Sequence, residues 1–200
     1  MQRKPDRLAE GTETYGDLGM NVRRLYFYNS ETHESLQVVR CAIAPDGASV
    51  AIGGADGTLR ILKTGTFTTL YEVSAGETEV TCLAWSPSGE HLVVCTSESP
   101  AVKVVVAGNS YSVQPFDDSP LQLCVYGPGG QLAFGLDDGS VLLSDDADSE
   151  NQTELTDYGE DLTSVAFSPS GKLVALGYDD TGLFVFAFTE GEWTEVFHFS

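Results

Sequence analysis

The feature that most constrains this chain is a short apolar strand followed by Pro, any residue and Gly, which occurs four times. The copies read VRCAIAPDG, VTCLAWSPSG, LQLCVYGPGG and LTSVAFSPSG, and they end at Gly47, Gly89, Gly130 and Gly171. The intervals between these glycines are 42, 41 and 41 residues, so one structural unit is repeated. A period of about 40 to 45 residues built from short strands is typical of a propeller blade.

Each unit contains four short stretches of strand-forming residues separated by turn residues. Pro ends the first strand because its φ is fixed, and Gly supplies the positive φ of a tight turn. Helical periodicity is absent from the sequence. The predicted fold is therefore all-β, a β-propeller of four-stranded antiparallel blades with four blades in this chain.

The first strands align on their prolines, and each aligned position has one character. A large apolar face is formed by Ile43, Trp85, Tyr126 and Phe167, two residues before Pro, and by Cys41, Leu83, Cys124 and Val165, four residues before it. The opposite face carries the smaller Ala42, Ala84, Val125 and Ala166. Because blades stack on one another, we expect both faces to be buried. The aromatic column is then core and not a ligand cage.

The four cysteines, Cys41, Cys82, Cys95 and Cys124, lie in predicted strands and include no C-x-x-C pair. We expect them to be buried, reduced, small apolar residues. The sequence indicates no metal site and no cofactor.

The chain carries 30 acids against 10 Lys and Arg, a formal net charge of −20. Twelve of these acids lie between Lys103 and Lys172, where no Lys, Arg or His occurs. Such a surface repels phosphate backbones and anionic lipid and attracts basic protein faces, although acidic loops also serve solubility alone. We expect protein partners, with no direct nucleic-acid or membrane binding. The candidate partner-docking residues are Asp145, Asp146, Asp148, Glu150, Asp117 and Asp118.

Catalytic motifs are missing from the sequence. There is no G-x-S-x-G nucleophile motif, and the three histidines are scattered. A propeller hydrolase would carry carboxylate, Asn or His side chains near the start of several first strands, where this chain has Val38, Val80, Leu121 and Leu162. We therefore expect a protein that is not an enzyme. The N-terminus is too polar for a signal peptide and no apolar stretch approaches the roughly 18 to 20 residues of a membrane span, which favours a cytoplasmic or nuclear location.

The repeats resemble the WD-repeat family of β-propellers over residues 22–200. The resemblance rests on CLAWSPSGEHL, SVAFSPSGKLVALG and GGADGTLRIL, the last with an Asp-Gly turn before the third strand. It implies turn residues Asp56, Gly57, Asp138, Gly139 and Asp180 that shape the blades. The family's Trp-Asp and Gly-His dipeptides are absent, so these are divergent repeats.

The resemblance implies a non-catalytic scaffold that docks partners on its faces and loops within a multiprotein complex. Two narrower resemblances are to the WD-repeat domain of anaphase-promoting complex subunit four and to acidic replisome scaffolds. The alternative function is an acidic reader of basic peptides, such as histone tails, or a subunit of a replisome or cell-cycle complex. A propeller hydrolase is the least favoured alternative.

We expect residues 1–21 to form a disordered arm and residues 22–200 to form the propeller. The expected blades are approximately 36–78, 79–118, 119–160 and 161–200, with an early strand at 24–28 that would complete a last blade. Because the family usually closes its ring with about seven blades, four blades indicate an incomplete ring. The missing half then belongs to a longer chain, although a rare four-bladed ring or self-association would also fit.

Overall fold

The computed structural model describes residues 8–15, 20–27, 37–97, 100–107, 110–144, 152–155, 158 and 161–200. All regular secondary structure in these ranges is β-strand. The strand bounds are β1 Leu8–Tyr15, β2 Met20–Phe27, β3 Val38–Ile43, β4 Ser49–Gly54, β5 Thr58–Lys63, β6 Thr69–Ser74, β7 Val80–Trp85, β8 His91–Thr96, β9 Pro100–Ala107, β10 Ser110–Tyr126, β11 Leu132–Leu136, β12 Val141–Ser144, β13 Gln152–Leu155, β14 Leu162–Phe167, β15 Leu173–Tyr178, β16 Gly182–Thr189 and β17 Glu192–Phe199.

The strands form four antiparallel blades, which confirms the predicted fold class. Blade 1 is β3 to β6 and blade 4 is β14 to β17, each a separate four-stranded sheet. Blades 2 and 3 share the long strand β10: its first part pairs with β9 of blade 2, and its last part pairs with β11 of blade 3. The pairing is irregular between Pro115 and Pro120, so the blade boundary expected near residue 118 falls inside this strand.

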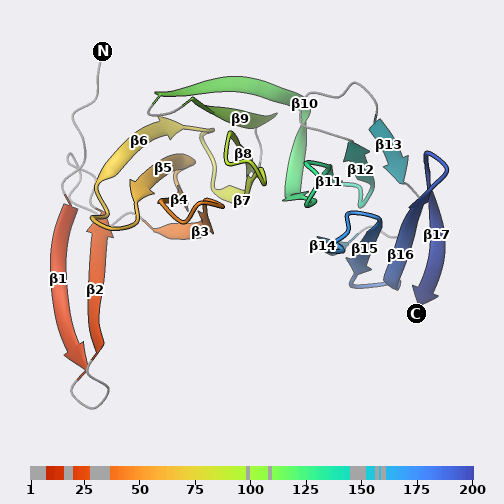
Figure 1. Cartoon of the computed structure of the whole chain (residues 1–200), viewed down its shortest axis with the longest axis horizontal. Helices are drawn as coiled ribbons and strands as arrows, with labels where there is room; N and C mark the ends of the chain where they lie inside the picture. The colour runs from red at the N-terminus through yellow and green to blue at the C-terminus, as the bar shows by residue number, and fades with distance from the viewer. Residues whose placement is uncertain are drawn as a thin grey trace.

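The blades stand side by side in an arc that stays open between blade 1 and blade 4 (Figure 1). Strands β3, β7 and β14 lie on the inner side of the arc, and β6, β13 and β17 lie on its outer side. The described residues thus form a partial propeller. None of them belongs to a helix that is long and apolar enough to cross a membrane.

The repeated Pro-x-Gly phrase forms the turn between the first and second strands of every blade. In blade 1 the amide of Gly47 donates a 2.9 Å hydrogen bond to the carbonyl oxygen of Ala44, and Gly47 has φ of 69°. Pro45 occupies the second turn position, where its fixed φ fits a type I turn. The equivalent turns close at Gly89, Gly130 and Gly171, all with positive φ. Glycine is required there because L side chains disfavour that conformation.

The core lies between the blades and not within any one of them. The cluster between blades 1 and 2 contains Ala51, Leu59, Ile61, Val80, Leu92 and Val94. The cluster between blades 2 and 3 contains Val93, Cys95, Leu121, Cys124 and Phe134, and the cluster between blades 3 and 4 contains Ala133, Val141, Leu143, Leu176 and Phe186. Each blade therefore buries its faces only against a neighbour.

Burial of the aligned first-strand columns depends on the blade. Trp85 packs between blades 1 and 2, and its indole Nε1 donates a 3.2 Å hydrogen bond to the carbonyl oxygen of Ala42. Ile43, at the equivalent place in blade 1, is 68% exposed, and Cys41 is also exposed. The prediction that both blade faces are buried is wrong for these two residues. They lie on the face of blade 1 against which no described blade packs.

Strands β1 and β2 form an antiparallel hairpin outside the arc of blades (Figure 1). Leu8 is opposite Phe27 and Tyr15 is opposite Met20. Strand β1 lies inside the segment that we expected to be a disordered arm, and β2 covers most of the early strand expected at 24–28. Its partner is β1 and not a strand of a last blade. The polar residues of β1 hid this pairing, because a strand in an isolated hairpin needs no apolar run.

Candidate docking face

Blades 1 and 2, and likewise blades 3 and 4, interlock through a glycine of the first blade and the first residue of the next blade's inner strand. A Cβ atom added to Gly53 would lie 2.5 Å from Cγ1 of Val80, and one added to Gly135 would lie 2.5 Å from Cδ2 of Leu162. Both distances are far below van der Waals contact. The glycines therefore leave the space into which the next blade inserts a branched aliphatic side chain.

A second contact comes from the third strand of each blade. Leu59 pairs with Gly53 across the sheet, and Val141 pairs with Gly135. Both side chains are completely buried, each in the cluster shared with the following blade. The glycine, the adjacent third-strand residue and the fourth-strand residue beyond it thus form the receiving surface of a blade.

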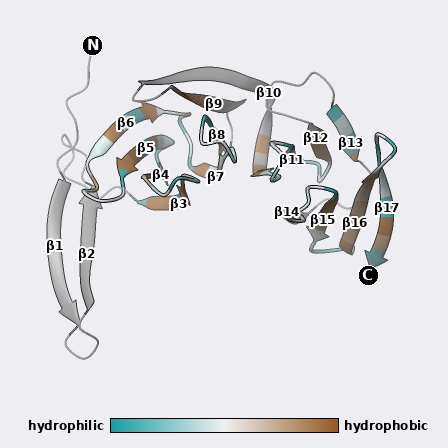
Figure 2. Cartoon of the chain, viewed as in Figure 1, coloured by the Kyte–Doolittle hydropathy of each residue, from teal (hydrophilic) through white to brown (hydrophobic). Residues whose placement is uncertain are grey.

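Blade 4 carries the same receiving surface, but no described blade covers it. Leu183 pairs with Gly177, as Leu59 pairs with Gly53, yet Leu183 is 38% exposed. Phe197 and Phe199, on the neighbouring strand β17, are 51% and 66% exposed. Figure 2 shows the apolar colouring of β16 and part of β17 at this end of the arc. We call the surface formed by Leu173, Gly177, Leu183, Phe197 and Phe199 the terminal face.

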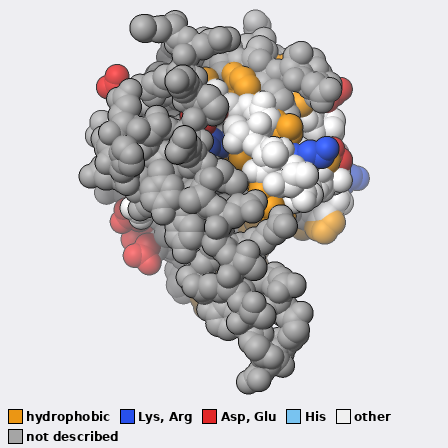
Figure 3. Space-filling view, turned by 90° about the vertical axis from the view of Figure 1, so that its left-hand side faces the viewer, with side chains coloured by type: hydrophobic (Ala, Val, Ile, Leu, Met, Phe, Trp, Pro, Cys, Tyr) orange, Lys and Arg blue, Asp and Glu red, His pale blue; other side chains and the backbone are white. Residues whose placement is uncertain are grey.

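The opposite end of the arc shows the complementary pattern. Val38 begins the inner strand of blade 1, as Val80 begins that of blade 2; Val80 is fully buried, whereas Val38 is 46% exposed. Figure 3 shows this end of the molecule, where hydrophobic side chains of described residues reach the surface near Lys or Arg. One end of the arc therefore exposes a receiving surface, and the other end exposes the inner-strand residue that inserts into such a surface in the other blades.

The predicted blade-structural residues form the turns between second and third strands. Asp56 Oδ1 accepts a 3.1 Å hydrogen bond from the amide of Thr58, and Gly57 has φ of 72°. Asp138 Oδ1 accepts a 2.9 Å bond from the amide of Ser140 and a 2.5 Å bond from its hydroxyl. These bonds hold the pKa of Asp138 below its ordinary value, chiefly through the Ser140 hydroxyl.

The Asp-Gly turn of blade 3 also contacts blade 4. Gly139, with φ of 81°, offers its carbonyl oxygen to the hydroxyl of Tyr178 at 2.9 Å. Burial, followed by the charges of Tyr158, Asp138 and Asp180, raises the pKa of Tyr178 to about 12. The turn of blade 4 has the same length, but Thr181 stands where blades 1 and 3 have Gly, and the positive φ falls one position later, on Gly182.

The candidate docking acids are only partly covered by the structure. Asp145, Asp146, Asp148 and Glu150 lie outside the described residues. For Asp117 and Asp118 only the backbone is described, within β10. The structure brings together a different acidic group: Asp137, Asp161 and Asp179 line a cavity of about 390 Å³ between blades 3 and 4. Sequence reasoning missed this group, although all three acids flank inner-strand or second-turn positions of the repeat.

The described cysteines are all reduced. Cys95 and Cys124 are buried as expected, Cys82 is half-buried, and Cys41 is exposed, which corrects its predicted burial. Among the described residues, no three His, Cys, Asp or Glu side chains are grouped so that they could hold a metal ion.

Comparison with known protein families agrees with this architecture. Residues 19–86 match the anaphase-promoting complex subunit 4 WD40 domain, and residues 149–186 match the WD domain, G-beta repeat. The chain belongs to the WD40-repeat β-propeller family. Propellers of this family typically serve as protein-interaction scaffolds and are generally non-catalytic. The first match also agrees with the narrower resemblance to anaphase-promoting complex subunit four.

Curated relatives of this WD40 propeller are much longer proteins. It is 25% identical over 174 residues to mitogen-activated protein kinase-binding protein 1 of Mus musculus. The matched region covers 78% of this chain and 11% of the relative. It is 40% identical over 57 residues to SEC12-like protein 2 of Arabidopsis thaliana, which covers 28% of this chain and 14% of the relative. The chain thus spans a small part of the relatives that it matches.

Solved structures share the fold. A chain in the crystal structure of the mitotic checkpoint complex aligns with a TM-score of 0.66 and 19% identity, over 84% of this WD40 propeller and 56% of that chain. The β-propeller domain of Cps50 (Swd1) from Myceliophteria thermophila aligns with a TM-score of 0.62 and 16% identity, over 78% and 57% of the two chains. These similarities extend to the fold alone.

Proposed function

We propose that this WD40 propeller is a protein-interaction scaffold of a multiprotein complex and that its terminal face docks a further propeller blade. The observation that carries the proposal is the exposure of Leu183, Phe197 and Phe199 at positions where the blades within the chain are covered by a neighbour. Exposed apolar surface of this kind marks interaction sites in soluble proteins.

The three interfaces inside the chain define the chemistry of the occupant. Val80 and Leu162 start the inner strands of blades 2 and 4, and Leu121 starts the part of β10 that pairs with β11 in blade 3. Val80 and Leu121 are almost completely buried against the preceding blade. The terminal face contains Gly177 at the position that Gly53 and Gly135 occupy in the receiving surfaces of blades 1 and 3. The matching occupant is therefore a four-stranded blade whose inner strand begins with Val or Leu.

Site-specific photocrosslinking in cells tests this proposal. A benzophenone amino acid replaces Phe197 in the tagged protein, and the crosslinked peptides are identified by mass spectrometry after purification. The matched control carries the same amino acid at Leu70, an exposed apolar residue of the outer strand β6 in blade 1. The expected product joins Phe197, but not the control position, to the inner strand of a propeller blade.

Other outcomes of the crosslinking contradict the docking role of the terminal face. A crosslink to a segment of the same polypeptide that is not part of a blade would contradict a contact between blades. A crosslink to a protein of another fold, or none above the level of the control, would remove the propeller blade as the occupant.

A second candidate function, the reading of basic peptides such as histone tails, is favoured by the acidic cavity. Its lining contains the carboxylates of Asp137, Asp161 and Asp179, and the chain as a whole carries a net charge of −20. Clustered carboxylates attract Lys and Arg side chains, and the attraction is screened by salt. Under this function the described surface would bind cell-cycle or chromatin-associated proteins through their basic segments.

Titration with a Lys- and Arg-rich peptide in steps of increasing salt tests the second candidate. The Asp161→Asn/Asp179→Asn variant should bind the peptide several-fold more weakly than wild type, whereas Asp46→Asn, in the first turn of blade 1, should not. Replacing Asp145, Asp146, Asp148 and Glu150 with Asn or Gln tests the acidic segment separately. Affinity that is unchanged in both multiple variants at low salt would exclude this function.

A further inference from the structure

Three thiols meet at the interface between blades 2 and 3. Cys82 on β7 and Cys95 on β8 face each other across blade 2, and Cys124 on β10 comes from blade 3. Cys82 Sγ lies 3.2 Å from the amide nitrogen of Cys124, from which it accepts a hydrogen bond, and 3.1 Å from the carbonyl oxygen of the same residue. The Cys82 sulfur therefore lies against the backbone of a cysteine that is 42 residues away in the chain.

The two thiols have opposite acid–base character. A hydrogen bond from the Cys124 side chain lowers the pKa of Cys82 to about 7; burial opposes this effect, while backbone hydrogen bonds and the positive charge of Arg40 assist it. The neighbouring thiols of Cys82 and Cys95, together with burial, raise the pKa of Cys124 well above its ordinary value. Cys82 is thus the thiolate of the pair and Cys124 is the protonated partner.

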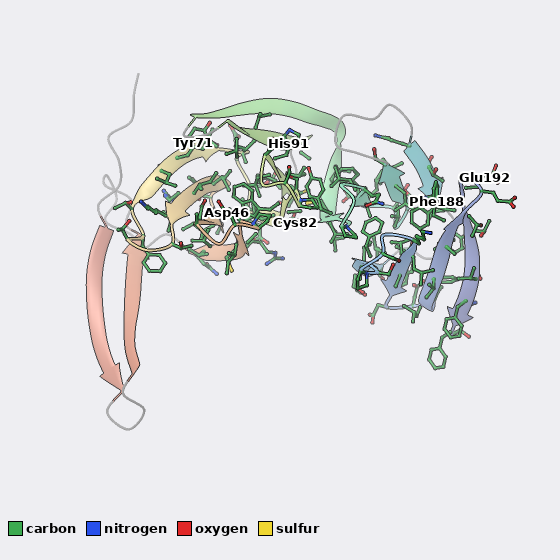
Figure 4. All side chains as sticks on the ribbon, in the orientation of Figure 1. Asp46, Tyr71, Cys82, His91, Phe188 and Glu192 are labelled. Atoms are coloured by element: carbon green, nitrogen blue, oxygen red, sulfur yellow. The ribbon has the colours of Figure 1, made fainter. Side chains whose placement is uncertain are left out.

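The thiols also differ in solvent exposure, and the thiol with the lowered pKa is the more exposed one. Cys82 is half-buried, whereas Cys95 and Cys124 are buried. Figure 4 shows Cys82 near the junction of blades 2 and 3. Arg40 lies beside this position, where its Nε donates a 2.6 Å hydrogen bond to the carbonyl oxygen of Thr81, the residue before Cys82. A small neutral oxidant can therefore reach Cys82 before it reaches the other two thiols.

We propose that Cys82 is a hydroperoxide-sensitive thiol that forms a reversible disulfide with Cys124 and so links blades 2 and 3. The Cys82 thiolate attacks the terminal oxygen of the hydroperoxide; the O–O bond breaks, Cys82 becomes a sulfenic acid, and the leaving alkoxide or hydroxide takes a proton from water and departs as an alcohol or water. Cys124 sulfur then attacks the sulfenic sulfur, the S–O bond breaks, and the departing hydroxide takes the Cys124 proton as water. Two thiols lose two electrons and the peroxide gains them.

The reaction is tested on the whole chain with hydrogen peroxide in slight excess. Remaining thiols are alkylated, the protein is digested without reduction, and linked peptides are mapped by mass spectrometry. The expected product joins the peptides of Cys82 and Cys124 at a mass about 2 Da below their sum, for two lost hydrogens. The thermal midpoint of the oxidised protein should be higher than that of the reduced protein, and a dithiol reductant should reverse the shift.

Variants and pH assign the roles of the two cysteines. Cys82→Ser should abolish the linkage, and Cys41→Ser, at the exposed cysteine, should leave its rate unchanged. Cys124→Ser should leave a sulfenic acid on Cys82 that dimedone traps. Because this buried substitution can unfold the protein, the wild-type rate is also followed against pH, and it should rise with a midpoint of about 7.

Three results would overturn the proposal. One is the absence of the Cys82–Cys124 peptide after complete peroxide consumption. Another is a linkage of Cys82 to Cys95, which would assign a different partner. The third is oxidation confined to Cys41 with the formation of intermolecular dimers.

Discussion

The phenolic hydroxyl of Tyr178 donates a 2.9 Å hydrogen bond to the carbonyl oxygen of Gly139, so that a side chain of blade 4 holds the Asp-Gly turn of blade 3. Tyr178 is buried, and its ring makes an edge contact with Phe184. The bond therefore satisfies a turn carbonyl and positions an aromatic residue of the interface between two blades.

Replacing Tyr178 by Phe should lower the free energy of unfolding by about 1 kcal/mol, because the carbonyl oxygen of Gly139 loses this donor. Urea denaturation measures the loss. The dependence of stability on alkaline pH provides an internal control. Because the folded-state pKa of Tyr178 is raised to about 12, the contribution of its hydroxyl to the free energy of unfolding is complete below the ordinary pKa of 10.0 and is lost as pH rises toward 12. The Phe variant should lack this part of the alkaline loss, and an identical profile would contradict the role of Tyr178.

Gly135→Ala should destabilise the protein by about 1 to 3 kcal/mol, because the new methyl group would overlap Leu162 of blade 4. Gly177→Ala is the matched control. Its methyl group would overlap only the hydroxyl of Ser164, a side chain that can rotate away, and would lie at ordinary contact distance from Thr163; no described blade packs there. We expect its effect to be near zero or slightly stabilising, since Ala loses less entropy than Gly on folding. Equal costs for the two variants in thermal denaturation would argue against the interlocking of blades.

The 200-residue chain expressed alone should be oligomeric or poorly soluble, because the terminal face leaves apolar side chains in water. Sedimentation velocity over a range of concentrations measures the self-association. Phe197→Ser/Phe199→Ser should reduce it, whereas Leu70→Ser, at an exposed apolar residue of blade 1, should have little effect. A wild-type chain that is monomeric at every concentration and melts cooperatively would contradict this prediction.

Asp138 should contribute to stability only where its carboxyl is ionised. Because hydrogen bonds from Ser140 lower its pKa below the ordinary value of 3.8, the contribution is present above that pH and is lost as pH falls through the folded-state pKa. Between about pH 5 and about pH 2, Asp138→Asn should therefore lose less stability than wild type. Urea unfolding at a series of pH values, with Ser140→Ala as the variant that removes the main cause of the shift, checks this expectation.

Two parts of the blade could be predicted well because their causes are local. Pro45 and Gly47 place the first turn through φ preferences that do not depend on the rest of the protein, and Asp138 with Gly139 does the same for the second turn of blade 3. The hairpin of β1 and β2 could not be predicted in the same way. Its strand Leu8–Tyr15 contains polar residues without an apolar run, and only pairing with β2 makes it a strand.

The candidate sites could not be predicted in this way, because they are formed by contacts between blades. Leu59 and Leu183 occupy equivalent positions in the repeat, yet Leu59 is buried and Leu183 is exposed, because a described blade packs only against Leu59. The acids Asp137, Asp161 and Asp179 come from two blades and line one cavity. The sequence does not indicate that these side chains lie close together. The same holds for Cys82 and Cys124, which the repeat pattern assigned to the core without indicating that their sulfur and backbone atoms meet.

The sequence by itself determined the repeat, the antiparallel blade and its turns, because the spacing of Pro and Gly and the alternation of apolar residues act within about 40 residues. Only the tertiary structure decided which copy of each repeated position is covered. A blade has no core of its own, so the burial of a side chain depends on whether another blade lies against it. The arc of four blades leaves Leu183 and Phe199 exposed at one end and Val38 at the other, because no described blade packs against either end.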